Sequence, residues 1–387
     1  MMRKAVCYAV LLWAVLYAPL AAAQSGSAPT FSPDSTSPDD ASRSAPGGWV
    51  TDQSGHCRLW SDHTLLGESV TWSGACEGGF ATGPGTAKWF MDGNLAETFV
   101  ASYVGGKLNG KGTQSYATGA RYEGDHVDNK RQGKGAFIWA NGNHYEGDFV
   151  AGKRTGRGVF TWANGNRYEG DFVQGKRTGK GAWTSNDGER FEGGFVDGKW
   201  SGAGVFVSKD GNRFEGIYVN GKAQGKCVWI AKKGNRYEGD IVDGKWSGKG
   251  TFTWVNGDRY EGDYADDVRT GRGVLLGANG SRYEGDFKNN RRTGKGVFTW
   301  RNGDRYEGDF VDDLFDGKGL FTTPKGTHFE GDFVEGKFNG EGVIIYPNDL
   351  RYEGDIANGM PNGLGVLTFP NGKKKKGIFE NGDYKGK

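Results

Sequence analysis

The segment GVFTWANGNRYEGDFVQGKRTGKG, residues 158–181, recurs in close copies every 23 residues along most of this 387-residue chain. Each copy contains an aromatic residue followed by Glu-Gly. With no insertion or deletion between copies, this anchor falls at Tyr122, Tyr145, Tyr168, Phe191, Phe214, Tyr237, Tyr260, Tyr283, Tyr306, Phe329 and Tyr352. A fixed period of this length predicts an array of small units, each packed against its neighbours, rather than one globular core.

The residues of one unit predict a β-hairpin. YEGDFV (168–173) alternates between two kinds of side chain, which is the period of a strand, and GVFTW (158–162) is rich in strand-forming residues. Asn164-Gly165 is a strong hairpin signal because both residues tolerate a positive φ. We expect GKRTGKG (175–181) to form the loop on the other side. No helical period is visible, so the predicted fold class is all-β.

Alternation along the strand assigns the side chains of a unit to two faces. Tyr168, Gly170 and Phe172 share one face, and Glu169 and Asp171 share the other. Glycine in a strand leaves room for a neighbouring ring to lie over the backbone. We therefore expect aromatic rings stacked from unit to unit to replace a conventional core.

This pattern, Y-E-G-D-F-x-x-G-K-R-x-G-K-G with F-x-W-x-N-G-x-R, resembles the MORN repeat (membrane occupation and recognition nexus). The resemblance implies an elongated single-layer antiparallel sheet of stacked hairpins. It also implies a scaffold with roles in membrane-lipid contact, protein tethering and self-association. Some units depart from the pattern: His126 stands where other units have Phe, and Gly194 and Ile217 replace the usual Asp.

The N-terminus predicts a signal peptide over residues 1–23. A short basic region (Met1–Lys4) precedes an apolar region (Ala5–Leu20), and Ala21–Ala23 supplies a small-residue cleavage site. The alternative is a retained membrane anchor, although the apolar run is short for a spanning helix. We expect an exported protein, in the bacterial periplasm or secreted, which would not meet intracellular phosphoinositides.

Three further segments follow the predicted signal peptide. Residues 24–48 are rich in Ser and Pro and predict a disordered tether. Residues 49–75 contain strand-like pieces outside the 23-residue phase and predict capping strands, because the open edge of an array must be closed. Residues 76–387 then form the predicted array of about thirteen units.

Cysteine usage fits an oxidising compartment. Removal of the signal peptide leaves Cys57, Cys76 and Cys227, an odd number. We predict a Cys57–Cys76 disulfide near the start of the array. Cys227 occupies a position that is glycine one repeat earlier and one repeat later, which favours a tolerated small substitution.

No constellation of residues predicts catalysis, a metal or a cofactor. The paired acids Glu169 and Asp171 recur in most units, whereas a glycosidase needs one asymmetric pair. We expect them to pair across strands with Lys176 and Arg177. The five histidines are scattered, and His56 with Cys57 matches no strong ligand motif. The mature chain has equal numbers of bases and acids, which gives no basic field for nucleic acid.

Two surfaces are candidate binding sites. The first is the aromatic face, represented by Tyr145, Trp162, Tyr168, Phe172, Tyr237, Trp254, Tyr260, Tyr283, Trp300 and Tyr306. Exposed apolar surface of this kind marks binding sites, but the rings could equally cover one another as a narrow core. The second is the basic end, formed by Lys373, Lys374, Lys375 and Lys376, which suits an anionic lipid or glycan head group or is simply a solvated edge.

The function predicted from these features is that of a non-enzymatic exported scaffold or adaptor. It would bind a protein partner or a membrane or envelope surface through the aromatic face and the charged loops. The alternative is a glycan-binding module, because Tyr and Trp faces beside Asn and Asp suit sugar rings. Edge strands at the array ends, such as Ile378–Tyr384, also make a homodimer possible.

Overall fold

The computed structural model describes residues 46–387. The predicted signal peptide (1–23) and most of the predicted tether (24–48) therefore lie outside the described residues. The described chain divides into two compact units, residues 46–222 and 223–387. Its regular elements are all β-strands, and none of the described residues belongs to a helix that could cross a bilayer.

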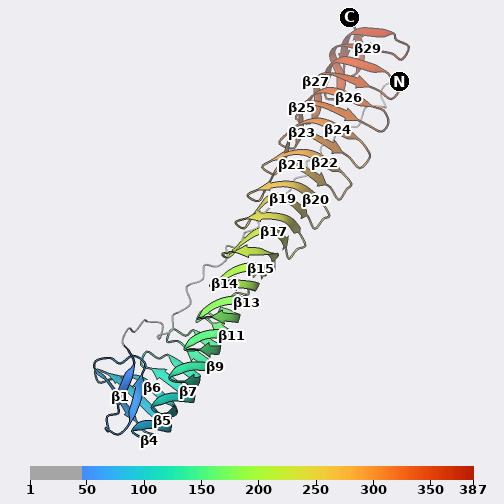
Figure 1. Cartoon of the computed structure of the whole chain (residues 1–387). Helices are drawn as coiled ribbons and strands as arrows, with labels where there is room; N and C mark the ends of the chain where they lie inside the picture. Colours follow the sequence, from blue (N-terminus) through green and yellow to red (C-terminus); the bar gives the residue numbers. More distant parts are fainter. Residues whose placement is uncertain (1–45) are drawn as a thin grey trace. The chain divides into compact units, whose positions relative to one another are not determined.

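In the first unit, every strand from β5 onward pairs antiparallel with the next strand in the chain (Figure 1). The strands are β1 (Gly48–Thr51), β2 (Arg58–Ser61), β3 (Glu68–Trp72), β4 (Ala75–Glu77), β5 (Phe80–Met91), β6 (Asn94–Val104), β7 (Lys107–Tyr116), β8 (Arg121–Val127), β9 (Lys130–Ile138), β10 (His144–Val150), β11 (Lys153–Thr161), β12 (Arg167–Val173), β13 (Lys176–Thr184), β14 (Arg190–Val196), β15 (Lys199–Val207) and β16 (Arg213–Val219).

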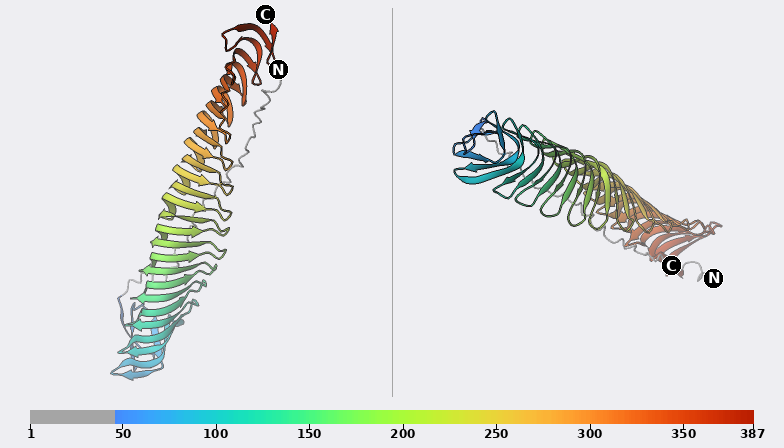
Figure 2. Two further views of the ribbon diagram at one scale, coloured as in Figure 1. Left: turned by 90° about the vertical axis from the view of Figure 1, so that its right-hand side faces the viewer. Right: turned by 90° about the horizontal axis from the view of Figure 1, so that it is seen from below.

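The second unit repeats this arrangement with the same register, and Figure 2 shows its hairpins following one another in chain order. Each unit is thus an open antiparallel sheet of hairpins, as the sequence predicts. The strands are β17 (Lys222–Ile230), β18 (Arg236–Val242), β19 (Lys245–Thr253), β20 (Arg259–Ala265), β21 (Val268–Leu276), β22 (Arg282–Lys288), β23 (Arg291–Thr299), β24 (Arg305–Val311), β25 (Leu314–Thr322), β26 (His328–Val334), β27 (Lys337–Ile345), β28 (Arg351–Ala357), β29 (Met360–Thr368), β30 (Lys374–Glu380) and β31 (Asp383–Gly386).

The N-terminal strands of the first unit build a small core of their own. β1 pairs with β2, while β3 and β4 both pair with the long strand β5. Buried Leu59, Val70 and Ala81 lie in this core. A disulfide joins Cys57 to Cys76, with the two Cα atoms 5.6 Å apart. These strands occupy the segment predicted to cap the array.

The predicted loop GKRTGKG is instead a strand. Residues Lys176–Thr184 form β13, and the turn before it has only two residues, Gln174 and Gly175, at φ values of +49° and +86°. At the other end of the hairpin, Trp162 and Asn166 close a tight turn with a 2.9 Å backbone hydrogen bond. The loop prediction was wrong because Gly181 packs against a tyrosine ring within the strand, while Gly175 and Gly179 adopt positive φ values at the turn and at the register shift.

That packing explains why two glycines recur in every unit. Tyr168 lies flat across its own strand and donates a hydrogen bond from its hydroxyl to the Asp171 carbonyl, at 3.1 Å. A Cβ atom added to Gly170 or to Gly181 would lie 2.5 Å from the Tyr168 side chain. Any side chain larger than hydrogen would therefore displace the ring.

The rings form a continuous core because each anchor tyrosine contacts an aromatic ring of the following repeat. Tyr168 meets the edge of Phe172 at 5.3 Å and that of Phe195 at 4.9 Å between ring centroids. Tyr283 meets Phe287 and Phe310 in the same way. Aromatic pairs prefer this edge-to-face geometry. Every repeat thus stabilises the following one.

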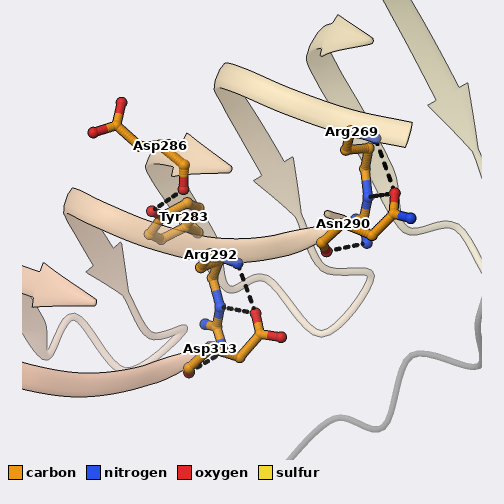
Figure 3. A network of polar contacts seen from close by, with 6 residues as sticks. All are labelled: Arg269, Tyr283, Asp286, Asn290, Arg292 and Asp313. Carbon is orange, nitrogen blue, oxygen red and sulfur yellow. Dashed lines mark hydrogen bonds and ion pairs between the residues drawn. The ribbon is translucent and has the colours of Figure 1, made fainter. Parts of the chain in front are cut away.

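A second core position, near the start of each long strand, receives an arginine in several repeats. Arg154 and Arg269 are buried there, with the guanidinium of Arg269 5.4 Å from the centre of the Tyr260 ring. Figure 3 shows that Arg269 donates to the Asn290 carbonyl at 2.7 Å and that Arg292 bonds Asp313 in the same manner. Other repeats place an aromatic residue at this position, for example Trp200.

Candidate functional site

The structure places the predicted aromatic face mainly inside the protein. The seven predicted Tyr and Phe residues are no more than 1% exposed, and they are Tyr145, Tyr168, Phe172, Tyr237, Tyr260, Tyr283 and Tyr306. Trp162, Trp254 and Trp300 are half-buried at the ends of their strands. A ligand on this face would touch the tryptophans rather than the stacked rings. The binding role of these residues stays a prediction.

The predicted basic end is exposed. Lys373, Lys374, Lys375 and Lys376 all lie at the surface, three of them in β30. Lys375 occupies the place of the anchor aromatic, and its ammonium lies 5.7 Å from the centre of the Phe369 ring. A ligand for these cations stays a prediction as well.

The face opposite the rings carries two charged rows. In one row an Arg and a Glu two residues apart form an ion pair, as Arg167 and Glu169 do at 2.7 Å. In the other row most of the Asp side chains accept a hydrogen bond from a backbone amide of the next strand, as Asp171 does from Lys180 at 3.1 Å. Many of these aspartates also bind a cation of the preceding repeat.

The cross-strand partners predicted for Glu169 and Asp171 were therefore wrong. Lys176 pairs with Asp197 at 3.2 Å, and Arg177 is buried with its guanidinium 5.6 Å from the centre of the Tyr168 ring. The physical reason is a register shift between Gly170 and Phe172, which turns Arg177 into the core.

A groove of about 920 Å³ runs between these two rows, across strands β7 to β12 of the first unit. Its floor is a row of strand glycines, namely Gly112, Gly124, Gly135, Gly147 and Gly158. One wall carries Glu123, Glu146 and Glu169, and the other carries Lys111, Asp125, Lys134 and Arg157. Because the groove crosses the strands, a ligand in it would meet one repeat after another.

Besides Asp125, whose carboxylate makes no ion pair, three charges in this groove lack partners among residues 46–387. Glu146 has no ion pair because His144 stands where other repeats have the arginine that binds this glutamate. The side chains of Lys111 and Arg157 likewise make no ion pair with a described residue. By contrast, Lys134 binds Asp148 at 2.6 Å. Unpaired charges of both signs can receive the charges of a ligand.

Two groups below this surface have shifted pKa values. Burial, together with the neighbouring Arg131 guanidinium, lowers the pKa of His126 to about 4, so the imidazole is neutral at pH 7. Burial also raises the pKa of the Cys227 thiol to about 12, which makes the thiol a poor nucleophile at pH 7.

The described residues contain no group of three or more His, Cys, Asp or Glu side chains placed to hold a metal ion. Of the residues considered from the sequence, Cys57 is in the disulfide and His56 lies 3.1 Å from the Ser54 hydroxyl. Most acids of the polar face are held in ion pairs or backbone hydrogen bonds, and Glu146 and Asp125 are the exceptions among the described residues of the groove.

Sequence reasoning missed the groove and its three free charges. The signal that could have revealed them was the substitution of His144 for arginine in an otherwise regular row of Arg-x-Glu sequences. The free cations carried no signal, because lysine or arginine stands at the same position in repeats where it is paired.

Comparison with known proteins identifies the repeats. The sequence profile of the family described as MORN repeat matches twelve consecutive stretches: 99–121, 122–144, 145–167, 168–190, 191–213, 214–236, 237–259, 260–282, 283–305, 306–328, 329–351 and 352–374. The stretches 76–98 and 375–387, which we predicted to be repeats, lie outside this match. No curated protein sequence matches the chain.

Solved structures with a similar fold include the TCP10 domain of Danio rerio CPAP, with a TM-score of 0.31 and 12% identity over 57% of this chain and 99% of that domain. The TCP domain of Drosophila melanogaster SAS-4, solved with a proline-rich motif of Ana2, has a TM-score of 0.25 and 15% identity over 52% of this chain and 90% of that one. Similarities this low carry no information about partners of this chain.

Proposed function

Since the chain belongs to the MORN repeat family, we propose that it is a non-enzymatic scaffold whose groove over residues 111–169 holds a protein partner. The observation that carries this proposal is the set of charges in the groove that make no ion pair with a described residue, namely Lys111, Glu146 and Arg157 beside Asp125. Charges that a folded protein leaves unpaired along one concave surface are available to a ligand at no cost in broken ion pairs.

The composition of the groove favours a protein over a membrane surface. Its walls carry three cations and four carboxylates, so both signs are present and neither dominates. An anionic membrane attracts clusters of cations and repels carboxylates. A polypeptide segment that carries both signs matches such a surface better.

A second candidate function, contact with an anionic envelope surface, is supported by the basic end. Lys373, Lys374 and Lys376 are exposed together. Such a cluster gains roughly 1 kcal/mol per cation near an anionic surface. This contact and the groove are compatible, because they involve different residues.

We further propose that the protein acts outside the cytoplasm. The predicted signal peptide motivates this location, and the Cys57–Cys76 disulfide supports it, because disulfides persist in oxidising compartments. Alkaline phosphatase fused after residue 60 would be active if the N-terminus directs export, and inactive fusions would contradict export.

The proposed function is tested by site-directed photocrosslinking. A photoreactive amino acid is placed at Val159 in the groove and, in a second protein, at Val274, which holds the same position five repeats later. We expect a defined protein to be crosslinked from Val159 and not from Val274. The crosslink should disappear when Lys111, Glu146 and Arg157 are all changed to Gln.

Parallel arms examine the other ligand classes. Anionic vesicles are mixed with the mature chain and with a variant in which Lys373, Lys374 and Lys376 are Gln, and polysaccharide pull-downs test glycans. Equal crosslinking from both positions, or no crosslinked protein at all, would contradict the groove as a protein-binding site. Competition by soluble sugars would support the glycan alternative instead.

A further inference from the structure

The proposed function above leaves the class of partner open, and we infer that the groove takes a segment in the polyproline II conformation. The segment carries an acid, a base five residues later and a second acid six residues after the first, or the same charges in reverse order. The inference rests on the proposed function and adds conformation and charge pattern to it.

The spacing of the hairpins selects this conformation. The groove crosses the strands, and two strands at about 4.8 Å give a repeat of about 9.6 Å along it. Polyproline II has three residues per turn and rises about 3.1 Å per residue, so one turn advances about 9.3 Å. One turn of the ligand therefore meets each hairpin in nearly the same way.

Other regular conformations fit this spacing less well. Two turns of an α-helix advance about 10.5 Å in seven residues, so the mismatch per repeat is about three times larger. A β-strand repeats its faces every two residues, or about 6.7 Å, so it departs from the repeat of a single hairpin by about 2.9 Å and matches the hairpins only over every second repeat. Polyproline II also lacks internal hydrogen bonds, so its backbone can accept contacts from the groove.

The free charges fix the pattern along the ligand. Lys111 and Arg157 are on the same wall, on β7 and β11, and four strand spacings of about 4.8 Å put them about 19 Å apart. Six residues of polyproline II span about 19 Å and complete two turns, so the side chain six positions after the first acid points to the same edge as that acid. Acids at these two positions therefore face Lys111 and Arg157.

The base follows from the opposite wall. Glu146 is on β10, three strand spacings or about 14 Å from Lys111 along the groove. The residue five positions after the first acid lies about 15 Å further along the ligand and points to a different edge of the three-sided helix. A Lys or Arg there meets the carboxylate of Glu146.

The same positions five repeats later provide a matched control. They are Lys226, Glu261 and Arg272, and each already has a partner: Asp240 at 2.6 Å, Arg259 at 2.9 Å and Asp286 at 3.7 Å respectively. A ligand there would have to replace existing ion pairs. We therefore expect the charge pattern to be recognised over residues 111–157 and not over residues 226–272.

The test uses fluorescent peptides and the full mature chain, with binding followed by fluorescence anisotropy at low salt. The first peptide is Asp-Pro-Pro-Pro-Pro-Arg-Asp-Pro-Pro, and the second has its acids and base exchanged. The third keeps the charges of the first and replaces every Pro by Ser. The variants are the triple change Lys111→Gln, Glu146→Gln and Arg157→Gln, and the triple change Lys226→Gln, Glu261→Gln and Arg272→Gln.

We expect the first peptide to bind about tenfold more tightly than the other two, and the first triple variant to lose about tenfold in affinity, which is about 1.4 kcal/mol. The control variant should bind like the unchanged protein. Equal binding of the serine peptide would overturn the conformation, and equal binding of the charge-exchanged peptide would overturn the pattern. If Val159 crosslinks a protein but no proline peptide binds, this inference fails while the proposed function stands.

Discussion

Residues 111–157 and residues 226–272 have the same strand register, but they differ at some core positions and in how their surface charges are paired. In the later segment Lys226, Glu261 and Arg272 are all in ion pairs. In the earlier one Lys111, Glu146 and Arg157 have no partner among the described residues. His144 in place of arginine explains why Glu146 is free. Lys111, Arg157 and their counterparts all lie opposite an aspartate, so their pairing differs in side-chain conformation alone.

This comparison shows where a repeat protein can acquire function without cost to its fold. The tyrosine, its two glycines and an edge-on aromatic ring fix the hairpin, and they recur in both segments. The outward rows are free to vary because exposed ion pairs contribute at most about 1 kcal/mol each. Binding specificity can therefore reside in departures from the consensus on the polar face.

The largest effect is expected from a valine at a core glycine. Gly170→Val should destabilise its repeat by about 3 kcal/mol or more, because even a Cβ atom would lie 2.5 Å from the Tyr168 hydroxyl. Gly285→Val, at the equivalent position beside Tyr283, should cost as much. Hydrogen exchange measured repeat by repeat would show the loss confined to the altered repeat and its neighbours. Collapse of all repeats together would contradict this nearest-neighbour packing.

Acidification should distinguish the two segments, because His126 occupies a core position that Ile241 holds five repeats later. The pKa of His126 is lowered to about 4, with Arg131 and Asp125 as its charged neighbours. Its contribution is fully present above pH 6.5 and is lost as the pH falls toward 4, by about 3 kcal/mol in total. Amide exchange in β8 and β9 should accelerate over this range, and His126→Phe should abolish the acceleration. An unchanged pH dependence in that variant would exclude His126 as the cause.

Replacing a buried arginine should have a moderate effect in both segments. Arg154→Met removes a 2.9 Å hydrogen bond to the Gly175 carbonyl, and Arg269→Met removes a 2.7 Å bond to the Asn290 carbonyl. We expect a cost of about 1–2 kcal/mol each in the free energy of unfolding, because methionine keeps the packing but not the charge-assisted bond. Urea denaturation would measure it. A gain in stability would show that desolvation of the guanidinium outweighs its contacts.

The smallest effect on stability is expected at the surface. Changing Lys111, Glu146 and Arg157 to Gln should alter the free energy of unfolding by less than about 0.5 kcal/mol, because no ion pair is lost. The same changes at Lys226, Glu261 and Arg272 should cost about 1 kcal/mol, and this cost should shrink in 1 M salt. Paired urea titrations at low and high salt provide the measurement. Equal costs for the two sets would contradict the assignment of free charges.

The sequence predicts the hairpin array well because its signals are local. The alternation in YEGDFV and the Asn-Gly turn each correspond to a single element of structure. The prediction from the sequence failed where a residue packs against a neighbouring strand or repeat. The glycines of GKRTGKG suggested a loop, but Gly181 accommodates a ring, and Arg177 suggested a surface ion pair but lies in the core.

The groove could not be predicted from the sequence for a related reason. Whether Lys111 is free or paired depends on the side-chain conformation of Asp125 on the next strand, and the same two residue types form a pair elsewhere. The burial of the aromatic face also depends on how rings from adjacent repeats overlap. The alternation of one strand shows which face a side chain takes but not how deeply it is covered.

The contact between the phenylalanine of one repeat and the tyrosine of the preceding repeat affects how the length of the array can change. Because Tyr168 meets Phe195 just as Tyr145 meets Phe172, the removal or duplication of 23 residues recreates the same junction on both sides. Unequal recombination within such a gene would yield a foldable chain each time. The number of repeats can therefore be inherited as an adjustable quantity, independent of the chemistry at any single groove.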